Sequence, residues 1–310
     1  MTARVLDPAT VAEAYREEVR ADVGALAGAG RRLRVVGLLG RTDGPAATYA
    51  RYARRGCRAV GIDFDLRHVG PAEVEGAIAA ANVEPDTDGV FLYYPLDNPA
   101  GDRWLRELVD PRKDVEGLHS FWSRLLYENQ RYLDPDRTQR AILPCTPLAI
   151  LKLLQHAGMA GRPAEQSTDA VAPLEGLTAC VINRSDLVGR PLAAMLANDG
   201  ALVHSLDVTG SVVFEPAIGR HTHDVRESGV GRAEALAAAD VVISAVPAAD
   251  FTRIRGEEIK PGAICVNVAE RANFDDSALD VAGVFVPRVG PLTVTMATRN
   301  LVRLAGLGLR

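Results

Sequence analysis

Residues 178–191, TACVINRSDLVGRP, decide the fold of this chain. The segment begins with a short apolar run that is typical of a buried strand, and a helix is expected from Gly189. The polar turn NRSD joins the two elements. In a parallel sheet such a turn presents the amino end of a helix, which attracts an anion such as a phosphate. The stretch therefore indicates either a Rossmann-type nucleotide-binding unit or an ordinary turn between a strand and a helix.

Strand-like and helix-like segments continue to alternate after this stretch. Strands are expected at 201–207, 240–247, 263–269 and 284–286, and helices at 232–239 and 292–307. This is the order of a Rossmann-type domain. The segment Thr209–Gly229 is longer than a typical loop, so we expect it to be functional or partly disordered. Gly161–Ala172 is predicted to be a small polar loop.

The first half of the chain alternates in the same way. Strands are expected at Arg34–Gly40, Ile62–Val69 and Gly89–Leu96, with helices from about Pro45 and over Pro71–Ala81. Such alternation indicates parallel strands covered by helices on both faces. A polar stretch with several prolines, Asp134–Pro147, is expected to connect two domains. We therefore predict an α/β fold with one domain over 1–149 plus the terminal helix 292–310, and a Rossmann-type domain over 150–291.

Composition narrows the possible functions of the chain. Its 310 residues are 47% hydrophobic and 24% charged, as in an ordinary globular protein. A net charge of −5 gives no reason to expect nucleic acid as a partner. No apolar run approaches the roughly 18–20 residues that cross a membrane, and the N-terminus lacks a signal peptide.

The cysteines and histidines do not form a metal-binding pattern. The four cysteines lie far apart without a CxxC pair, which favours a reducing cytoplasm. His221 and His223 have no cysteine or suitably placed carboxylate nearby, so we expect surface residues and no bound metal. Cys145 lies between two prolines, and we expect it to form a rigid wall and not to act as a nucleophile.

The nucleotide-binding signal depends on four positions. Asn183 stands where the G-x-G-x-x-G motif would place its first glycine, and only Gly189 remains. Asp207 follows near the spacing of about 20 residues at which an acid binds the adenosine ribose, which favours NAD over NADP. The alternative is a strand end that only faces solvent. Arg184 leaves NADP open as the alternative cofactor, because a guanidinium there could pair with its 2′-phosphate. Ser185 has the alternative role of a helix cap.

Four motifs in order resemble those of the methylenetetrahydrofolate dehydrogenase family. They are NRSDLVGRP at 183–191, LPCTP at 143–147, KDVEG at 113–117 and VPRVGPLT at 286–293, and PLEG at 173–176 is similar to the segment before the nucleotide strand. The match covers nearly the whole chain. The insertion after Asp207, the KDVEG variant and RYLD at 131–134 are most similar to the monofunctional NAD-dependent branch known from yeast.

The resemblance implies an oxidoreductase of one-carbon metabolism. The family transfers a hydride from 5,10-methylenetetrahydrofolate to a nicotinamide cofactor, here NAD, and its members are homodimers. Bifunctional relatives also hydrolyse the methenyl product, with a lysine four residues after a substrate-binding tyrosine. Tyr49 matches that tyrosine, but Ala53 stands at the lysine position and Tyr93 at that of a supporting glutamine. No general base remains, so we expect cyclohydrolase activity to be absent.

The resemblance also assigns binding residues. Glu116 matches the acid that accepts two hydrogen bonds from the pterin, although it could instead cap the helix that begins near Ser120. Tyr49 would stack on the folate or else only pack in the core. The other residues that the resemblance places against the folate are Tyr93, Pro287 and Gly290. NAD would contact Asn183, Arg184, Ser185, Gly189 and Asp207, with Ala245, Val246 and Pro247 beside the nicotinamide. Substrate and cofactor would meet between the two domains.

Three other interpretations remain at the level of sequence. An NADP-dependent bifunctional dehydrogenase/cyclohydrolase is disfavoured by Ala53 and Asp207. A shikimate-type dehydrogenase would explain the Rossmann half of the chain but not KDVEG or LPCTP. A non-catalytic folate- or nucleotide-binding protein is the third, because Asn183 and Arg288 replace glycines of the family pattern.

Overall fold

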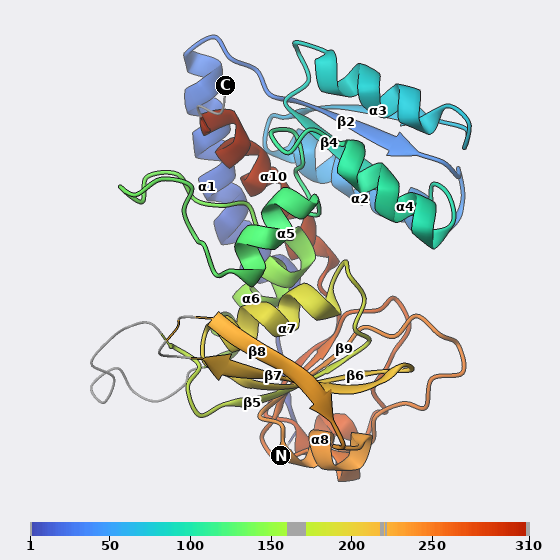
Figure 1. Cartoon of the computed structure of the whole chain (residues 1–310), viewed down its shortest axis with the longest axis vertical. Helices are drawn as coiled ribbons and strands as arrows, with labels where there is room; N and C mark the ends of the chain where they lie inside the picture. Colours follow the sequence, from blue (N-terminus) through green and yellow to red (C-terminus); the bar gives the residue numbers. More distant parts are fainter. Residues whose placement is uncertain (1, 160–171, 218–219, 221, 308–310) are drawn as a thin grey trace. The chain divides into compact units, whose positions relative to one another are not determined.

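The computed structural model describes residues 2–159, 172–217, 220 and 222–307. The chain divides into two compact units, which are described separately. Unit 1 comprises Met1–Val11, Leu126–Gln130 and Thr146–Gly290, and unit 2 comprises Ala12–Leu125, Arg131–Cys145 and Pro291–Arg310. Both units have a parallel α/β core, so the predicted fold class is confirmed (Figure 1).

Unit 2 is built on a small parallel sheet with strand order β3-β2-β4. The strands are β2 (Arg34–Leu39), β3 (Asp63–His68) and β4 (Gly89–Tyr93). The helices are α1 (Pro8–Gly28), α2 (Gly44–Ala59), α3 (Val74–Val83), α4 (Pro99–Leu108), α5 (Ser120–Tyr127) and α10 (Gly290–Gly306), of which α1, α5 and α10 each include residues of unit 1. Side chains from β2, β4, α3 and α4 form one buried cluster, so α3 and α4 cover the same face of this sheet.

Unit 1 contains an eight-stranded sheet with strand order β1-β11-β10-β9-β5-β6-β7-β8. The strands are β1 (Arg4–Val5), β5 (Thr178–Ile182), β6 (Leu202–Asp207), β7 (Gly210–Ala217), β8 (Thr222–Ser228), β9 (Val241–Ser244), β10 (Ile264–Asn267) and β11 (Val284–Val286). All neighbouring pairs are parallel except β6–β7 and β7–β8, which are antiparallel. The helices are α6 (Cys145–Ala157), which begins with a residue of unit 2, α7 (Gly189–Asn198), α8 (Arg232–Ala238), α9 (Ala278–Val281) and the 3-10 helix η3 (Gly256–Glu258).

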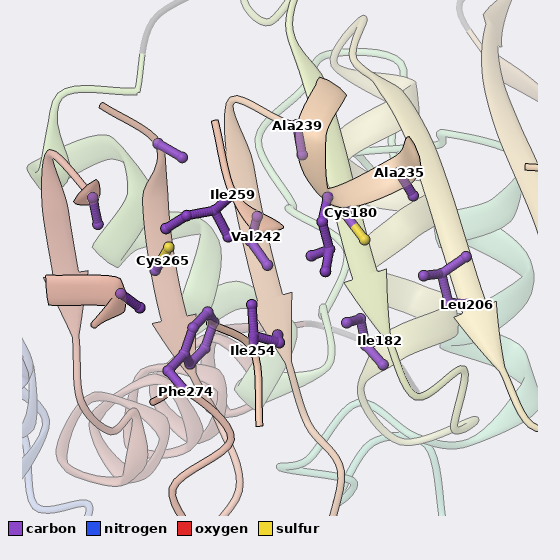
Figure 2. Close-up of a cluster of buried hydrophobic side chains, with 14 of the residues drawn as sticks. Cys180, Ile182, Leu206, Ala235, Ala239, Val242, Ile254, Ile259, Cys265 and Phe274 are labelled. Atoms are coloured by element: carbon purple, nitrogen blue, oxygen red, sulfur yellow. The ribbon is translucent and has the colours of Figure 1, made fainter. Parts of the chain in front are cut away.

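The core of unit 1 lies on the face of this sheet that α8 covers. Figure 2 shows Cys180 and Ile182 of β5, Val242 of β9 and Cys265 of β10 in one buried cluster, which Phe274 also joins. α7 packs on the opposite face, so both faces are covered (Figure 1). Each large apolar side chain buried in this way contributes about 1.5–3 kcal/mol to stability. This core holds the carboxyl ends of the parallel strands in place.

The segment after Asp207 differs from the sequence prediction. Thr209–Gly229 was expected to be a long functional or partly disordered loop, but β7 and β8 within it form a hairpin that extends the sheet. The turn between β6 and β7 has only two residues, since Asp207 pairs with Gly210. The loop prediction for Gly161–Ala172 concerns residues that, except for Ala172, lie outside the described part of the chain.

Candidate active site

The turn after β5 has the geometry that the missing glycine would supply. Asn183 adopts a φ of 82°, a left-handed conformation that few residues other than glycine and asparagine tolerate. Its side-chain amide donates to the carbonyl of Ala245 at 2.7 Å. Gly189 is required for a different reason, because a Cβ there would lie 1.8 Å from the carbonyl oxygen of Asn183. The turn therefore passes tightly over the first residue of α7.

Asp207 and Arg184 lie together at the carboxyl ends of β6 and β5. The backbone N–H of Arg184 donates to Asp207 Oδ2 at 2.7 Å, and the N–H of Thr209 donates to Oδ1 at 3.4 Å. Asp207 is partly buried, and the next residue, Val208, is fully exposed. Ser185 Oγ accepts from the N–H of Val188 at 3.3 Å, so its hydroxyl caps the turn that precedes α7.

The turn after β9 is held by an asparagine that the sequence did not single out. Asn273 is buried, and its Oδ1 accepts from the Val246 N–H at 2.9 Å and from the Ser244 hydroxyl at 2.8 Å. Its side-chain N–H donates in turn to the carbonyl of Val246 at 3.0 Å. The predicted residues Ala245 and Val246 are thus fixed through Asn183 and Asn273. Its neighbours Glu270, Arg271 and Asp275 are charged, so nothing in the sequence distinguishes this asparagine from a surface residue.

Asn267 extends the same network to the segment after β11. Its Oδ1 accepts from the Asn273 N–H at 2.8 Å, and its side-chain N–H donates to the carbonyl of Pro287 at 3.3 Å. Pro287 and Gly290 therefore belong to the carboxyl end of the large sheet in unit 1. The other residues predicted for folate, Tyr49, Tyr93 and Glu116, lie in unit 2.

Tyr49 and Tyr93 are in contact in unit 2. Their rings meet edge to face, with centroids 5.7 Å apart. Burial raises the pKa of both phenols well above the ordinary value of 10.0. The hydroxyl of Tyr93 has no hydrogen-bond partner among the described residues, and that of Tyr49 faces the Cys145 thiol. Ala53 is fully buried one helical turn after Tyr49.

Glu116 lies beside these tyrosines on a small cavity. One of its carboxylate oxygens accepts from the Leu92 N–H at 3.3 Å. Removal from water, and then the nearby Asp114 carboxylate, raise the pKa of Glu116 to about 8. The other charged or polar side chains that line the cavity are those of Tyr94, Arg106, Asp114 and His119.

The alternative role of Glu116 as a helix cap is wrong. The N–H of Ser120, the first residue of α5, donates to the carboxylate of Glu107 at 3.2 and 3.3 Å. Asp114 accepts instead from the backbone N–H groups of the following loop, including those of Gly117 at 2.9 Å and His119 at 2.8 Å. The Glu116 carboxylate therefore does not cap α5.

His223 is not the surface residue that the sequence predicted. It is partly buried on β8, and its Nδ1 lies 2.8 Å from Asn198 Oδ1. Among the described residues no group of three or more His, Cys, Asp or Glu side chains could hold a metal ion. Within the same residues, no helix is both long and apolar enough to cross a membrane. His221 lies outside the described part of the chain.

Two sequence profiles of one family match the chain. The profile described as the catalytic domain of tetrahydrofolate dehydrogenase/cyclohydrolase matches residues 6–116. The profile for the NAD(P)-binding domain of the same family matches residues 144–307.

Individual relatives match over nearly their whole length. A methylenetetrahydrofolate dehydrogenase [NAD(+)] from Schizosaccharomyces pombe is 36% identical over 97% of this chain and 92% of its own. The solved structure of the NAD-dependent 5,10-methylenetetrahydrofolate dehydrogenase from Saccharomyces cerevisiae matches with a TM-score of 0.90 at 35% identity, over 98% of both chains. A bifunctional FolD protein from Azoarcus is 31% identical over 97% of this chain and 96% of its own.

Proposed function

Because the chain belongs to the tetrahydrofolate dehydrogenase/cyclohydrolase family, we propose that it oxidises 5,10-methylenetetrahydrofolate to 5,10-methenyltetrahydrofolate with NAD as the oxidant. The observation that carries the proposal is the match to NAD-dependent relatives over 97–98% of the chain. Bound NAD supplies the hydride acceptor. The chain's own residues have to bind and orient the two reactants, and hydride transfer itself needs no titrating side chain.

The residues at the carboxyl end of the large sheet fit a dinucleotide. Gly189 lets the turn pass close to the amino end of α7, where a pyrophosphate is stabilised. Asp207 ends β6, where a carboxylate can accept hydrogen bonds from both ribose hydroxyls. We assign Asn183, Arg184 and Ser185 to the same site, and Ala245, Val246 and Pro247 to the nicotinamide side.

The family resemblance assigns five residues to the folate. Glu116 would accept from the pterin N3–H and 2-amino groups, a bidentate contact that its carboxylate can make. Tyr49 would stack on an aromatic ring of the substrate, and Tyr93, Pro287 and Gly290 would complete the contacts. The proposed folate domain is 1–149 with 292–310, and the proposed NAD domain is 150–291.

We also propose that the enzyme does not hydrolyse its product. Ala53 places a methyl group where bifunctional relatives carry a lysine, and a methyl group cannot move a proton. Tyr93 cannot replace the lysine, since burial raises its pKa well above 10.0 and leaves it a neutral phenol at physiological pH.

The proposed reaction is tested by absorbance. Purified protein is mixed with 5,10-methylenetetrahydrofolate and either NAD or NADP, and the appearance of NADH and of methenyltetrahydrofolate is followed. We expect equal amounts of both products with NAD. Absence of NADH formation with a substrate that the protein binds would overturn the proposal in favour of a non-catalytic binding protein.

The assembly and location of the enzyme are further parts of this proposal. A homodimer is supported by β8, which is the last strand of its sheet and carries the half-exposed Val225. An unpaired strand edge of this kind can pair with a second copy. Sedimentation of wild type and of Val225→Glu tests this, and a wild-type monomer would refute it. A cytoplasmic location is supported by the four cysteines, all of which are buried and form no disulfide among the described residues.

A further inference from the structure

The Arg184 guanidinium is bound by the chain around Asp207. Its Nη1 donates to the carbonyl of Ser205 at 2.9 Å and to that of Gly210 at 3.2 Å. Its Nη2 donates to Thr209 Oγ1 at 3.0 Å. These three acceptors lie before and after Asp207, on β6, on the two-residue turn and at the start of β7. A planar guanidinium that meets three such acceptors has little freedom to turn elsewhere.

The turn after β5 and the end of β6 are also joined by a second contact, in which the backbone of Arg184 binds the side chain of Asp207. The backbone N–H of Arg184 donates to Asp207 Oδ2 at 2.7 Å, so the carboxylate is held by the turn after β5. The side chain of Arg184 then holds the strand and turn that carry the carboxylate. Loss of the Arg184 side chain would leave the Asp207 carboxylate held by the backbone N–H groups of Arg184 and Thr209, without the contacts that fix its strand and turn.

We infer that Arg184 is a positioning residue for Asp207 and not a ligand of a 2′-phosphate. The inference rests on the proposed function, because it concerns the same nucleotide site. To bind a 2′-phosphate, the guanidinium would have to leave three acceptors that it already satisfies. Arg184 and Asp207 therefore act in the same direction, and both favour NAD.

The hairpin of β7 and β8 gives this arrangement its cause. Thr209 Oγ1 and the Gly210 carbonyl reach Arg184 because the chain reverses directly after Asp207 and pairs Asp207 with Gly210. A loop that left β6 in another direction would not bring these two acceptors back to the turn after β5. The hairpin thus supplies hydrogen-bond acceptors for the Arg184 guanidinium, which would otherwise be available to bind the 2′-phosphate of NADP.

Calorimetric binding of NAD and NADP tests the inference without depending on catalysis. Arg184→Ala should weaken NAD binding about tenfold, or about 1.4 kcal/mol, because the strand and turn that carry Asp207 lose the guanidinium contacts. NADP binding should stay unchanged or become tighter. Arg184→Lys separates the two roles further: an ammonium can still bind a phosphate, but it cannot span the three acceptors. We expect it to lose NAD affinity as Arg184→Ala does.

A double-mutant cycle with Asp207→Ser shows whether Arg184 acts through the carboxylate. In the Asp207→Ser background, Arg184→Ala should cause no further loss of NAD affinity. Arg226→Ala is the matched control, since Arg226 is an exposed arginine on β8 of the same hairpin and pairs with Glu215. It should bind both cofactors as wild type does. Thr209→Val provides a milder variant if Arg184→Ala does not fold. It should change the affinities for NAD and NADP as Arg184→Ala does, but by less.

The outcomes separate this inference from the proposed function. A selective loss of NADP affinity in Arg184→Ala, or retention of NAD affinity in Arg184→Lys, would overturn the positioning role alone. Additive losses in the double-mutant cycle would also overturn it. A wild-type protein that binds neither cofactor would overturn the proposed function.

Discussion

Glu116→Gln should stabilise the unliganded protein at alkaline pH and weaken its binding of folate. The pKa of Glu116 is raised from 4.5 to about 8 by removal from water, and next by the Asp114 carboxylate. In the unfolded chain this carboxyl ionises near 4.5, so unfolding between pH 4.5 and 8 releases a proton. The stability that the protonated form provides is therefore present below pH 4.5 and is lost as the pH rises to about 8.

The structure sets the size of the effect. A pKa of about 8 against 4.5 corresponds to at most about 5 kcal/mol, because each pH unit is worth 1.36 kcal/mol. Glu116 is only partly buried, and solvent screening leaves about 1–2 kcal/mol. For units of this size that is an increase in Tm of about 2–8 °C. Glutamine retains an oxygen for the Leu92 N–H, so the backbone contact survives.

Thermal unfolding of wild type and Glu116→Gln at pH 5, 7 and 8.5 measures this effect. The variant should exceed wild type in Tm by a margin that grows with pH. Glu17→Gln, an exposed glutamate on α1, is the control and should show no such growth. A margin that is equal at pH 5 and 8.5 would refute the reasoning. In the same samples folate should bind the variant at least about tenfold more weakly, with NAD binding unchanged, because one pterin acceptor becomes a donor.

Three further predictions concern the two binding regions. Methenyltetrahydrofolate added to the enzyme should decay at the buffer rate, because Ala53 supplies no base, and faster decay would contradict the proposed monofunctional activity. Gly189→Ala should lower both Tm and NAD affinity, since its Cβ would lie 1.8 Å from the Asn183 carbonyl oxygen; wild-type values by melting and calorimetry would show that the turn adjusts freely. Wild type should prefer NAD over NADP at least about tenfold in kcat/KM, about 1.4 kcal/mol, and Asp207→Ser should shrink that ratio mainly through weaker NAD binding. A ratio unaffected by the substitution would show that Asp207 does not contact the ribose.

The sequence predicted those elements whose side chains have a clear period. β5, β6, β9 and β10 are short apolar runs, and the structure places a strand in each predicted run. Helix α1 was not predicted, because alanine and charged residues leave it with a weak apolar face. β7 and β8 were missed for another reason. Pro216, Gly219 and two histidines interrupt the alternation that identifies a hairpin.

The chemistry of the candidate site was only partly accessible from sequence. The positions of Asp207 and Gly189 at the ends of their elements follow from local spacing. The contacts of Arg184 do not, because they require the hairpin to fold back on the end of β5. The pKa of Glu116 likewise depends on Asp114 and on burial in three dimensions. Asn273 escaped notice because a lone asparagine has no recognisable pattern.

The carboxamides of Asn183, Asn273 and Asn267 link the ends of β5, β9, β10 and β11 in series. A carboxamide does not ionise at physiological pH, so a change in pH does not break these hydrogen bonds. The proposed folate residue Glu116 of unit 2 differs, because its pKa is raised to about 8. Acidification should therefore affect the binding of the two ligands unequally. The Michaelis constant for folate should change with pH around neutrality, while these four strand ends keep the same geometry. A change in pH would then alter the binding of the folate substrate, and the carboxamide hydrogen bonds at the strand ends would stay the same.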